Sequence, residues 1–251
     1  MRVRFASTAL GGGAVALLTV VLSLTAAAQA PARKNAPPPP AAAAAPAAPA
    51  AAEPSGDAKG IPGNAAAVPA LSVAGFRSAK FGMAEAEVRA AIEKDFGVKP
   101  DQIRSEENLA EQTHVLGVRV PDLLAGGGTA EVSYVFGYKT KKLIEVTSLW
   151  SKATDDKMTP ERLFSNGNIL RAHFSSEGYQ PDSIVTNGVM NNGIVMFRGS
   201  DAEGHTTVLV LQGTTSEGAD KQRVLTPTAL LLFYLADAKN PDVFKLPPGQ
   251  F

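Results

Sequence analysis

Three histidines are the most chemically versatile side chains in this 251-residue chain, which contains no cysteine. They are His114, His173 and His205, and no two have the i,i+4 spacing that places two metal ligands on one helix face. His114 alternates onto an apolar face of a predicted strand, and His173 stands beside Phe174 on a predicted helix. We therefore interpret them as structural or surface residues, and predict no metal site and no cofactor.

Serines and carboxylates show no catalytic spacing. The chain has no G-x-S-x-G sequence and no serine with lysine three positions later. Asp155-Asp156 lies in a polar segment, and the acidic run 201–204 lacks the longer ladder of a calcium loop. The glycines 126–128 open a predicted strand rather than a helix, so we interpret them as a plain loop. No catalytic residue is assigned, and a hydrolase with a site assembled from distant residues is kept as an alternative.

Four aromatic residues fall on neighbouring predicted strands: Tyr134, Phe136, Tyr138 and Trp150, with Tyr138 at a hairpin tip. Core packing is the interpretation we favour for this pattern. The alternative is a sheet face or edge that receives a peptide or a partner strand. These four residues are the candidate partner surface.

The first half of the body predicts one helix followed by three strands. Val88, Ile92 and Phe96 recur every four residues, which predicts an amphipathic helix over 84–97. Alternating apolar residues predict the strands, at 113–120, 129–136 and 142–150. The connector 137–141 is short enough for a hairpin, which indicates antiparallel pairing.

The second half repeats this order. Thr159-Pro160 predicts a helix start, and the helix should reach Glu177 with a kink or break at 166–168. Strands are predicted after it, at 183–189, 194–197, 206–211 and 230–235. The fold class is therefore α+β with antiparallel sheet, built from two helix-plus-meander units. We place the units at 71–155 and 156–251, with one continuous domain as the alternative.

The N-terminus is typical of a secretory signal peptide. Arg2 and Arg4 precede an apolar run that ends in small residues, and we predict cleavage between Ala28 and Gln29. An uncleaved membrane anchor is the alternative, since the apolar run just reaches the length of a bilayer span. Lipoprotein processing is excluded because no cysteine follows the run. We expect an exported, periplasmic protein that contacts the membrane only if this segment is retained.

Residues 29–70 form a second N-terminal segment, in which 31–70 hold 17 Ala and 10 Pro. This composition predicts a disordered spacer, because it offers almost nothing to bury. The body from 71 to 251 carries 19 basic and 22 acidic residues, a net charge near −3. That balance argues against a nucleic-acid partner.

Part of the body resembles small bacterial envelope domains of the BamE type. The likeness rests on Phe81-Gly82-Met83, the helix with Val88 and Ile92, the strand 132–136 and the segment 142–146. It covers about residues 76–150 and implies a non-catalytic envelope protein that acts through protein contacts. The chain departs from that family in lacking a lipidated cysteine, and we carry no binding residue over. The function expected is protein or peptide binding in the cell envelope, with the hydrolase and an inner-membrane-anchored spacer protein as alternatives.

Overall fold

The computed structural model describes residues 71–217, 223–247 and 249, which belong to one compact unit. The predicted signal peptide, its cleavage site at Ala28 and Gln29, and the Ala/Pro-rich segment lie outside the described residues.

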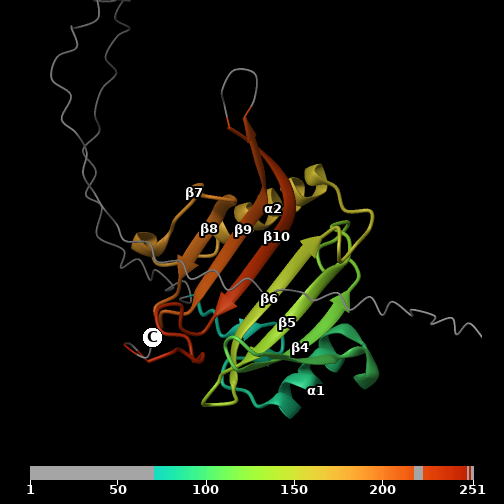
Figure 1. Ribbon diagram of the computed structural model, residues 1–251, viewed down its shortest axis with the longest axis vertical. Helices are drawn as coiled ribbons and strands as arrows, with labels where there is room; N and C mark the ends of the chain where they lie inside the picture. The colour runs from blue at the N-terminus through green and yellow to red at the C-terminus, as the bar shows by residue number, and fades with distance from the viewer. Residues whose placement is uncertain (1–70, 218–222, 248, 250–251) are drawn as a thin grey trace, which may run out of the picture. The chain divides into compact units, whose positions relative to one another are not determined.

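One antiparallel sheet of eight strands is the centre of the fold (Figure 1). Its strands lie in the order β3-β4-β5-β6-β10-β9-β8-β7. Their bounds are β3 (Arg104–Asn108), β4 (Thr113–Val120), β5 (Ala130–Phe136), β6 (Leu143–Ser151), β7 (Gly188–Met190), β8 (Gly193–Ser200), β9 (Thr206–Glu217) and β10 (Arg223–Leu235). Two short strands, β1 (Gly75–Phe76) and β2 (Ala79–Lys80), form a separate hairpin. The α+β class with antiparallel sheet is confirmed.

Two helices accompany the sheet, α1 (Glu85–Phe96) and α2 (Pro160–Ser175), with one-turn 3-10 helices at Pro100–Gln102 and Pro181–Ser183. The Thr159 hydroxyl caps α2 by accepting from the Arg162 N–H at 3.3 Å. The expected break at 166–168 does not occur. Asn166 and Gly167 are buried, the Asn166 amide donates to the Gly127 carbonyl at 2.9 Å, and a Cβ on Gly167 would come within 2.5 Å of the Met196 sulfur. Asn166 and Gly167 thus lie where α2 packs closely against Gly127 and Met196.

The two halves meet where β6 pairs with β10. Residues 229–235 run antiparallel to 145–151 in unbroken register, so the predicted units 71–155 and 156–251 share one sheet. Helix α1 precedes the strands of the first half and α2 those of the second. Each half is therefore a helix followed by four strands, and the last strand of each lies at the centre.

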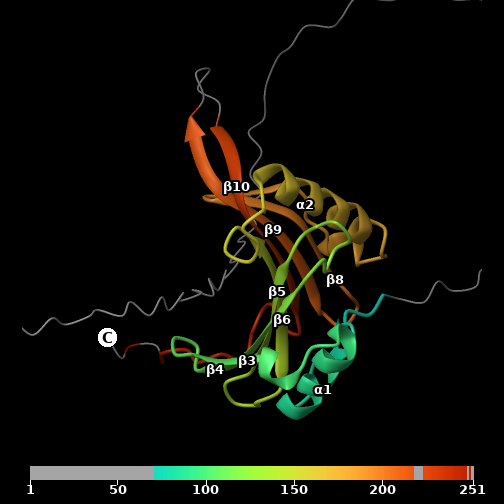
Figure 2. The same ribbon diagram turned by 90° about the vertical axis from the view of Figure 1, so that its right-hand side faces the viewer.

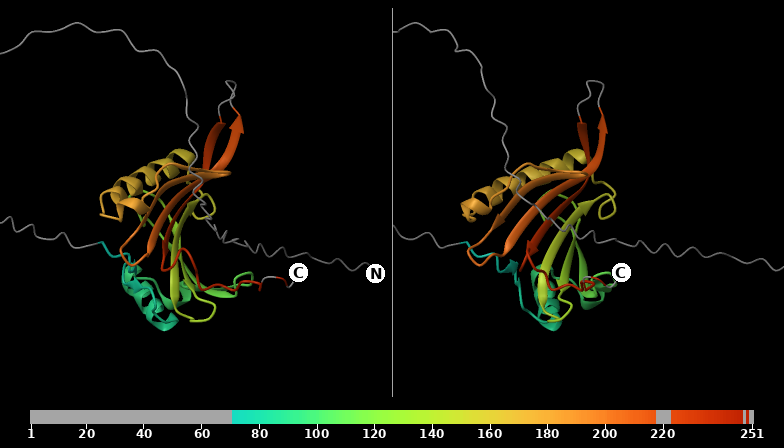
Figure 3. Two further views of the ribbon diagram at one scale, coloured as in Figure 1. Left: turned by 90° about the vertical axis from the view of Figure 1, so that its left-hand side faces the viewer. Right: turned by 60° about the vertical axis from the view of Figure 1, so that its left-hand side comes forward.

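Both helices lie on the same side of the sheet (Figures 2 and 3). Val88 and Ile92 of α1 lie in one cluster of buried side chains with residues of β4, β5 and β6. Leu163 and Phe174 of α2 lie in a second cluster with residues of β8, β9 and β10. Tyr234 packs against both clusters, so the two helices cover one continuous apolar face.

Strand β3 was not predicted. Its sequence, Arg-Ser-Glu-Glu-Asn, has no apolar alternation, and it forms by pairing with β4 at the edge of the sheet. Charged residues are common on edge strands because they discourage pairing with other chains. The predicted strand 183–189 is shorter than expected: Gly188–Met190 is β7, while Val185 reaches β8 through a single bridge to Arg198.

We predict one cooperative unfolding transition, because the β6–β10 pairing makes both helices depend on the same sheet. Ile92→Ala should lower the free energy of unfolding by about 2–4 kcal/mol, since this side chain is fully buried. Ile169→Ala, on the exposed side of α2, should change it by less than about 0.5 kcal/mol. Urea titration followed by circular dichroism tests both, and two separate transitions would contradict the single unit.

Candidate functional site

Three of the four candidate aromatic residues are buried. Tyr134, Phe136 and Trp150 have relative exposures of 0%, 1% and 1% and lie within the clusters under the helices. Tyr138 is half-buried at the β5–β6 hairpin, where its ring meets Phe244 edge-on at 5.5 Å. Tyr134, Phe136 and Trp150 are thus packed in the core, and Tyr138 is the one of the four that is partly exposed.

The opposite face of the sheet, which no helix of the described residues covers, is the candidate functional site, and we call it the helix-free face. Because successive strand residues point to opposite faces, the neighbours of the core residues on β6, β8, β9 and β10 point away from the helices. Six larger apolar residues among them adjoin one another in the sheet and belong to neither core cluster: Leu149, Val195, Val208, Val210, Leu231 and Phe233. We call this set the apolar patch. Leu149, Leu231 and Phe233 remain partly exposed.

The patch is contiguous across four strands. Leu149 pairs with Leu231, Leu231 with Val210, and Val210 with Val195. In the neighbouring row Phe233 stands beside Val208. The β3–β4 end of the sheet and the β9–β10 hairpin both turn away from the helices, so the helix-free face is concave (Figure 2).

Charged side chains border the apolar patch on the β3–β5 side. Glu131 is buried and its carboxylate accepts from Arg104, while the Arg119 Nε lies 3.9 Å from its second oxygen. Gly117 leaves room for this cluster, since a Cβ there would come within 3.3 Å of the Arg104 guanidinium. Arg104 also lies 3.6 Å from the Glu106 carboxylate, so two carboxylates and two guanidinium groups balance each other along this border.

Glu145 lies on the same face, at the end of β6. Burial raises the pKa of its carboxyl to about 7; the hydroxyl of Thr147, which donates to it at 2.8 Å, works against the rise, and the nearby Glu111 carboxylate adds to it. The C-terminal segment passes close by, because the Phe244 N–H donates to the Glu111 carbonyl at 2.8 Å. Glu145 therefore gains and loses its proton near neutral pH.

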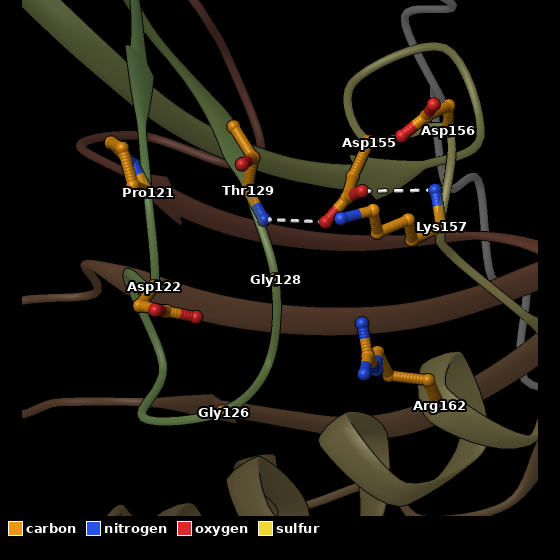
Figure 4. A pocket seen from close by; sticks show the side chains of 9 residues that line it. All are labelled: Pro121, Asp122, Gly126, Gly128, Thr129, Asp155, Asp156, Lys157 and Arg162. Atoms are coloured by element: carbon orange, nitrogen blue, oxygen red, sulfur yellow. Dashed lines mark hydrogen bonds between the residues drawn. The ribbon is translucent and has the colours of Figure 1, made fainter.

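A shallow recess of about 390 Å³ lies between the 121–129 loop, the 155–157 turn and the start of α2 (Figure 4). The N–H groups of Thr129 and Lys157 donate to Asp155 at 3.0 Å each and hold the pKa of that carboxyl below its usual range. Through these two bonds Asp155 joins the 121–129 loop to the 155–157 turn. The recess mixes carboxylates with the cations Lys157 and Arg162, so its lining selects no particular ligand.

Ser105, His114 and Glu107 form a relay at the β3–β4 edge. The Ser105 hydroxyl lies 3.2 Å from His114 Nε2, and the Glu107 carboxylate lies 2.7 Å from Nδ1. These distances match a nucleophile, base and orienting acid. Ser105 and Glu107 are nevertheless exposed, and Nε2 is also 3.5 Å from the Glu85 carboxylate. Sequence reasoning missed this cluster because it depends on the unpredicted strand β3.

The other polar groups singled out in the sequence have structural roles. The buried Asp201 carboxylate accepts from the backbone N–H groups of Val73 and His205 at 2.8 and 2.9 Å, which fixes the turn before β9. Within the described part of the chain, no three His, Asp or Glu residues are grouped as metal ligands. His173 lies 3.4 Å from Glu177 on the exposed surface of α2.

Comparisons with protein-family models, with curated proteins and with solved structures find no match to this chain. Neither helix in the described residues is long and apolar enough to span a bilayer.

The raised pKa of Glu145 predicts a stability that depends on pH. The unfolded side chain loses its proton near pH 4.5, whereas the folded one keeps it to about pH 7. Between these values the native state binds more protons, so its stability should fall as the pH rises. Glu145→Gln should remove about 1–2 kcal/mol of this fall, a figure reduced because the side chain is partly exposed. Urea titrations at pH 5 and pH 8 measure it, with Glu217→Gln as the exposed control; equal pH slopes for wild type and Glu145→Gln would contradict the assignment.

Proposed function

We propose that this is an exported, non-enzymatic protein that binds a partner protein in the bacterial cell envelope through the helix-free face of its sheet. The observation that carries the proposal is the apolar character of β9 and β10 on both of their faces. Antiparallel sheets with one solvated face usually alternate apolar and polar residues. Here the helix-free side of the central strands carries Val208 and Val210, which are buried, and Leu231 and Phe233, which are partly exposed, as expected for a sheet that receives a second layer.

The partly exposed members of the apolar patch, Leu149, Leu231 and Phe233, would supply most of the binding energy. Covering an aliphatic or aromatic side chain stabilises an interface by about 1.5–3 kcal/mol relative to leaving it in water. Leu149, Leu231 and Phe233 adjoin one another across the β6–β10 pairing. Three such side chains are enough for a specific hot spot at the centre of an interface.

The remaining features support an envelope protein. The N-terminal charge and apolar run favour export to the periplasm, and the spacer would give the body reach if the N-terminus were retained in the membrane. The net charge near −3 argues against nucleic acid as the partner. The resemblance of residues 76–150 to BamE-type domains also favours action through protein contacts.

Placing a charge in the apolar patch should abolish the complex. Phe233→Glu should lower at least tenfold the amount of complex recovered from the envelope fraction, because the new carboxylate would be desolvated against apolar side chains. Phe164→Glu is the matched control, since Phe164 is 52% exposed on α2. Size-exclusion chromatography of the tagged protein measures the complex, and a urea titration shows that both variants fold. A solitary monomer from wild-type cells would overturn the proposal.

A second candidate function is hydrolysis, favoured by the relay of Ser105, His114 and Glu107. If it operates, Ser105→Ala and His114→Ala should each abolish ester cleavage. The binding proposal expects no change, because the serine is exposed on an edge strand. Hydrolysis of p-nitrophenyl acetate by wild type and both variants decides, with Ser165→Ala on the exposed side of α2 as control.

A further inference from the structure

We infer that the partner covers the helix-free face with an amphipathic helix, and that a carboxylate on this helix pairs with Arg198. The inference rests on the proposed function and specifies its partner. It comes from two polar side chains on the helix-free face, Arg198 and Gln212.

Arg198 is a cation within an apolar setting. It pairs through β8 with Val208 of the apolar patch and bridges Val185 on its other side. Phe197 before it lies in the core, and a Cβ on Gly199 after it would contact the buried Tyr179 ring, so Arg198 points to the helix-free face. The side chain is half-buried, and no carboxylate of residues 71–217 or 223–247 lies within ion-pair distance of it. A partly desolvated guanidinium without a counter-charge favours an acidic partner group.

The other charged groups of this face do not supply that counter-charge. The Glu131 carboxylate already pairs with Arg104 and Arg119. Glu145 accepts from Thr147, and burial raises the pKa of its carboxyl to about 7. Arg104 also pairs with Glu106 at 3.6 Å. Arg104 and Arg119 thus have carboxylates at ion-pair distance, whereas Arg198 has none among the described residues, so charge complementarity places an acidic group opposite Arg198.

Gln212 is a second polar side chain on this face that lacks a partner among the described residues. Its side chain follows Val208 and Val210 on the same face of β9, and its buried Nε2 has no hydrogen-bond acceptor among the described residues. A buried donor without an acceptor costs about 1–3 kcal/mol, which an acceptor on a partner would recover. Val208, opposite Arg198, and Gln212 are four residues apart, about 14 Å along the strand. A helix of about nine residues spans that distance.

A helix fits this face better than an extended strand or a lipid. Every sheet strand beneath the patch already pairs on both sides. An extended segment laid on the face would therefore leave its own backbone N–H and C=O groups unpaired against apolar side chains. A helix satisfies its backbone internally and presents an apolar stripe. An acyl chain needs a site that encloses most of its surface, whereas a sheet face covers a ligand from one side only.

Site-specific photo-cross-linking in the producing cells tests the inference. Benzoylphenylalanine replaces Leu231 in the full-length protein, and mass spectrometry of the adduct reads the cross-linked peptide. We expect a peptide with apolar residues at i, i+3, i+4 and i+7 and an Asp or Glu beside that stripe. Arg198→Glu should reduce the adduct at least tenfold, and Arg198→Gln should reduce it less. Arg162→Glu, which reverses an exposed arginine beside the recess, should leave it unchanged. Changing the partner's acidic residue to lysine should restore the adduct in Arg198→Glu.

The outcomes distinguish a failure of the acidic-helix inference from a failure of the proposed function. An adduct that survives Arg198→Glu would overturn the acidic helix and leave the proposed function standing. An adduct to a lipid, to residues 29–70 of the same chain or to a second copy, or no adduct at all, would overturn both. Urea titration of both Arg198 variants shows whether the loss of the adduct reflects loss of the fold.

Discussion

The pairing of β6 with β10 is the constraint on which the rest of the structure depends. Each half of the chain could bury one face of a four-strand sheet under its own helix, but the seven-residue register between 145–151 and 229–235 makes the two sheets one. Because residues on one face of a strand alternate with those on the other, the same register sets both faces at once. On one side it brings Trp150 beside Leu230 under the helices, and on the other it brings Leu149 beside Leu231.

The consequence is a sheet with two helices on one face and none, among the described residues, on the other. Central strands that are apolar on both faces are stable when both faces are covered. The chain covers one with α1 and α2, and the proposed partner covers the second. Arg198 and Gln212 are polar side chains on the uncovered side. Among the described residues Arg198 has no carboxylate at ion-pair distance and the Gln212 Nε2 has no hydrogen-bond acceptor, and the proposed partner would supply both. Glu145, at the end of the same face, ties the stability of this region to the pH near neutrality.

Local pattern predicted the elements that have strong periodicity. Helix α1 and strand β4 follow from the spacing of apolar residues, whereas the strand at 230–235 was chosen over a helix from a continuous apolar run. The edge strand β3 was not predicted, because its charged sequence is extended only through its pairing with β4. The site was predicted least well. Core packing was the interpretation favoured for the aromatics, and Trp150 and Tyr134 are core residues. The apolar patch consists instead of Val and Leu residues and Phe233. Whether they face the helices or solvent depends on the β6–β10 register, which no local pattern contains.

Cysteine labelling tests the central claim most directly, because the chain has no native cysteine. The rate of maleimide reaction at Leu231→Cys is compared between the purified protein and intact cells, with Phe164→Cys on the exposed side of α2 as the reference. We expect Leu231→Cys to react readily in the purified protein and at least tenfold more slowly in cells, while Phe164→Cys reacts alike in both. Equal rates at Leu231→Cys in the two preparations would contradict a covered helix-free face.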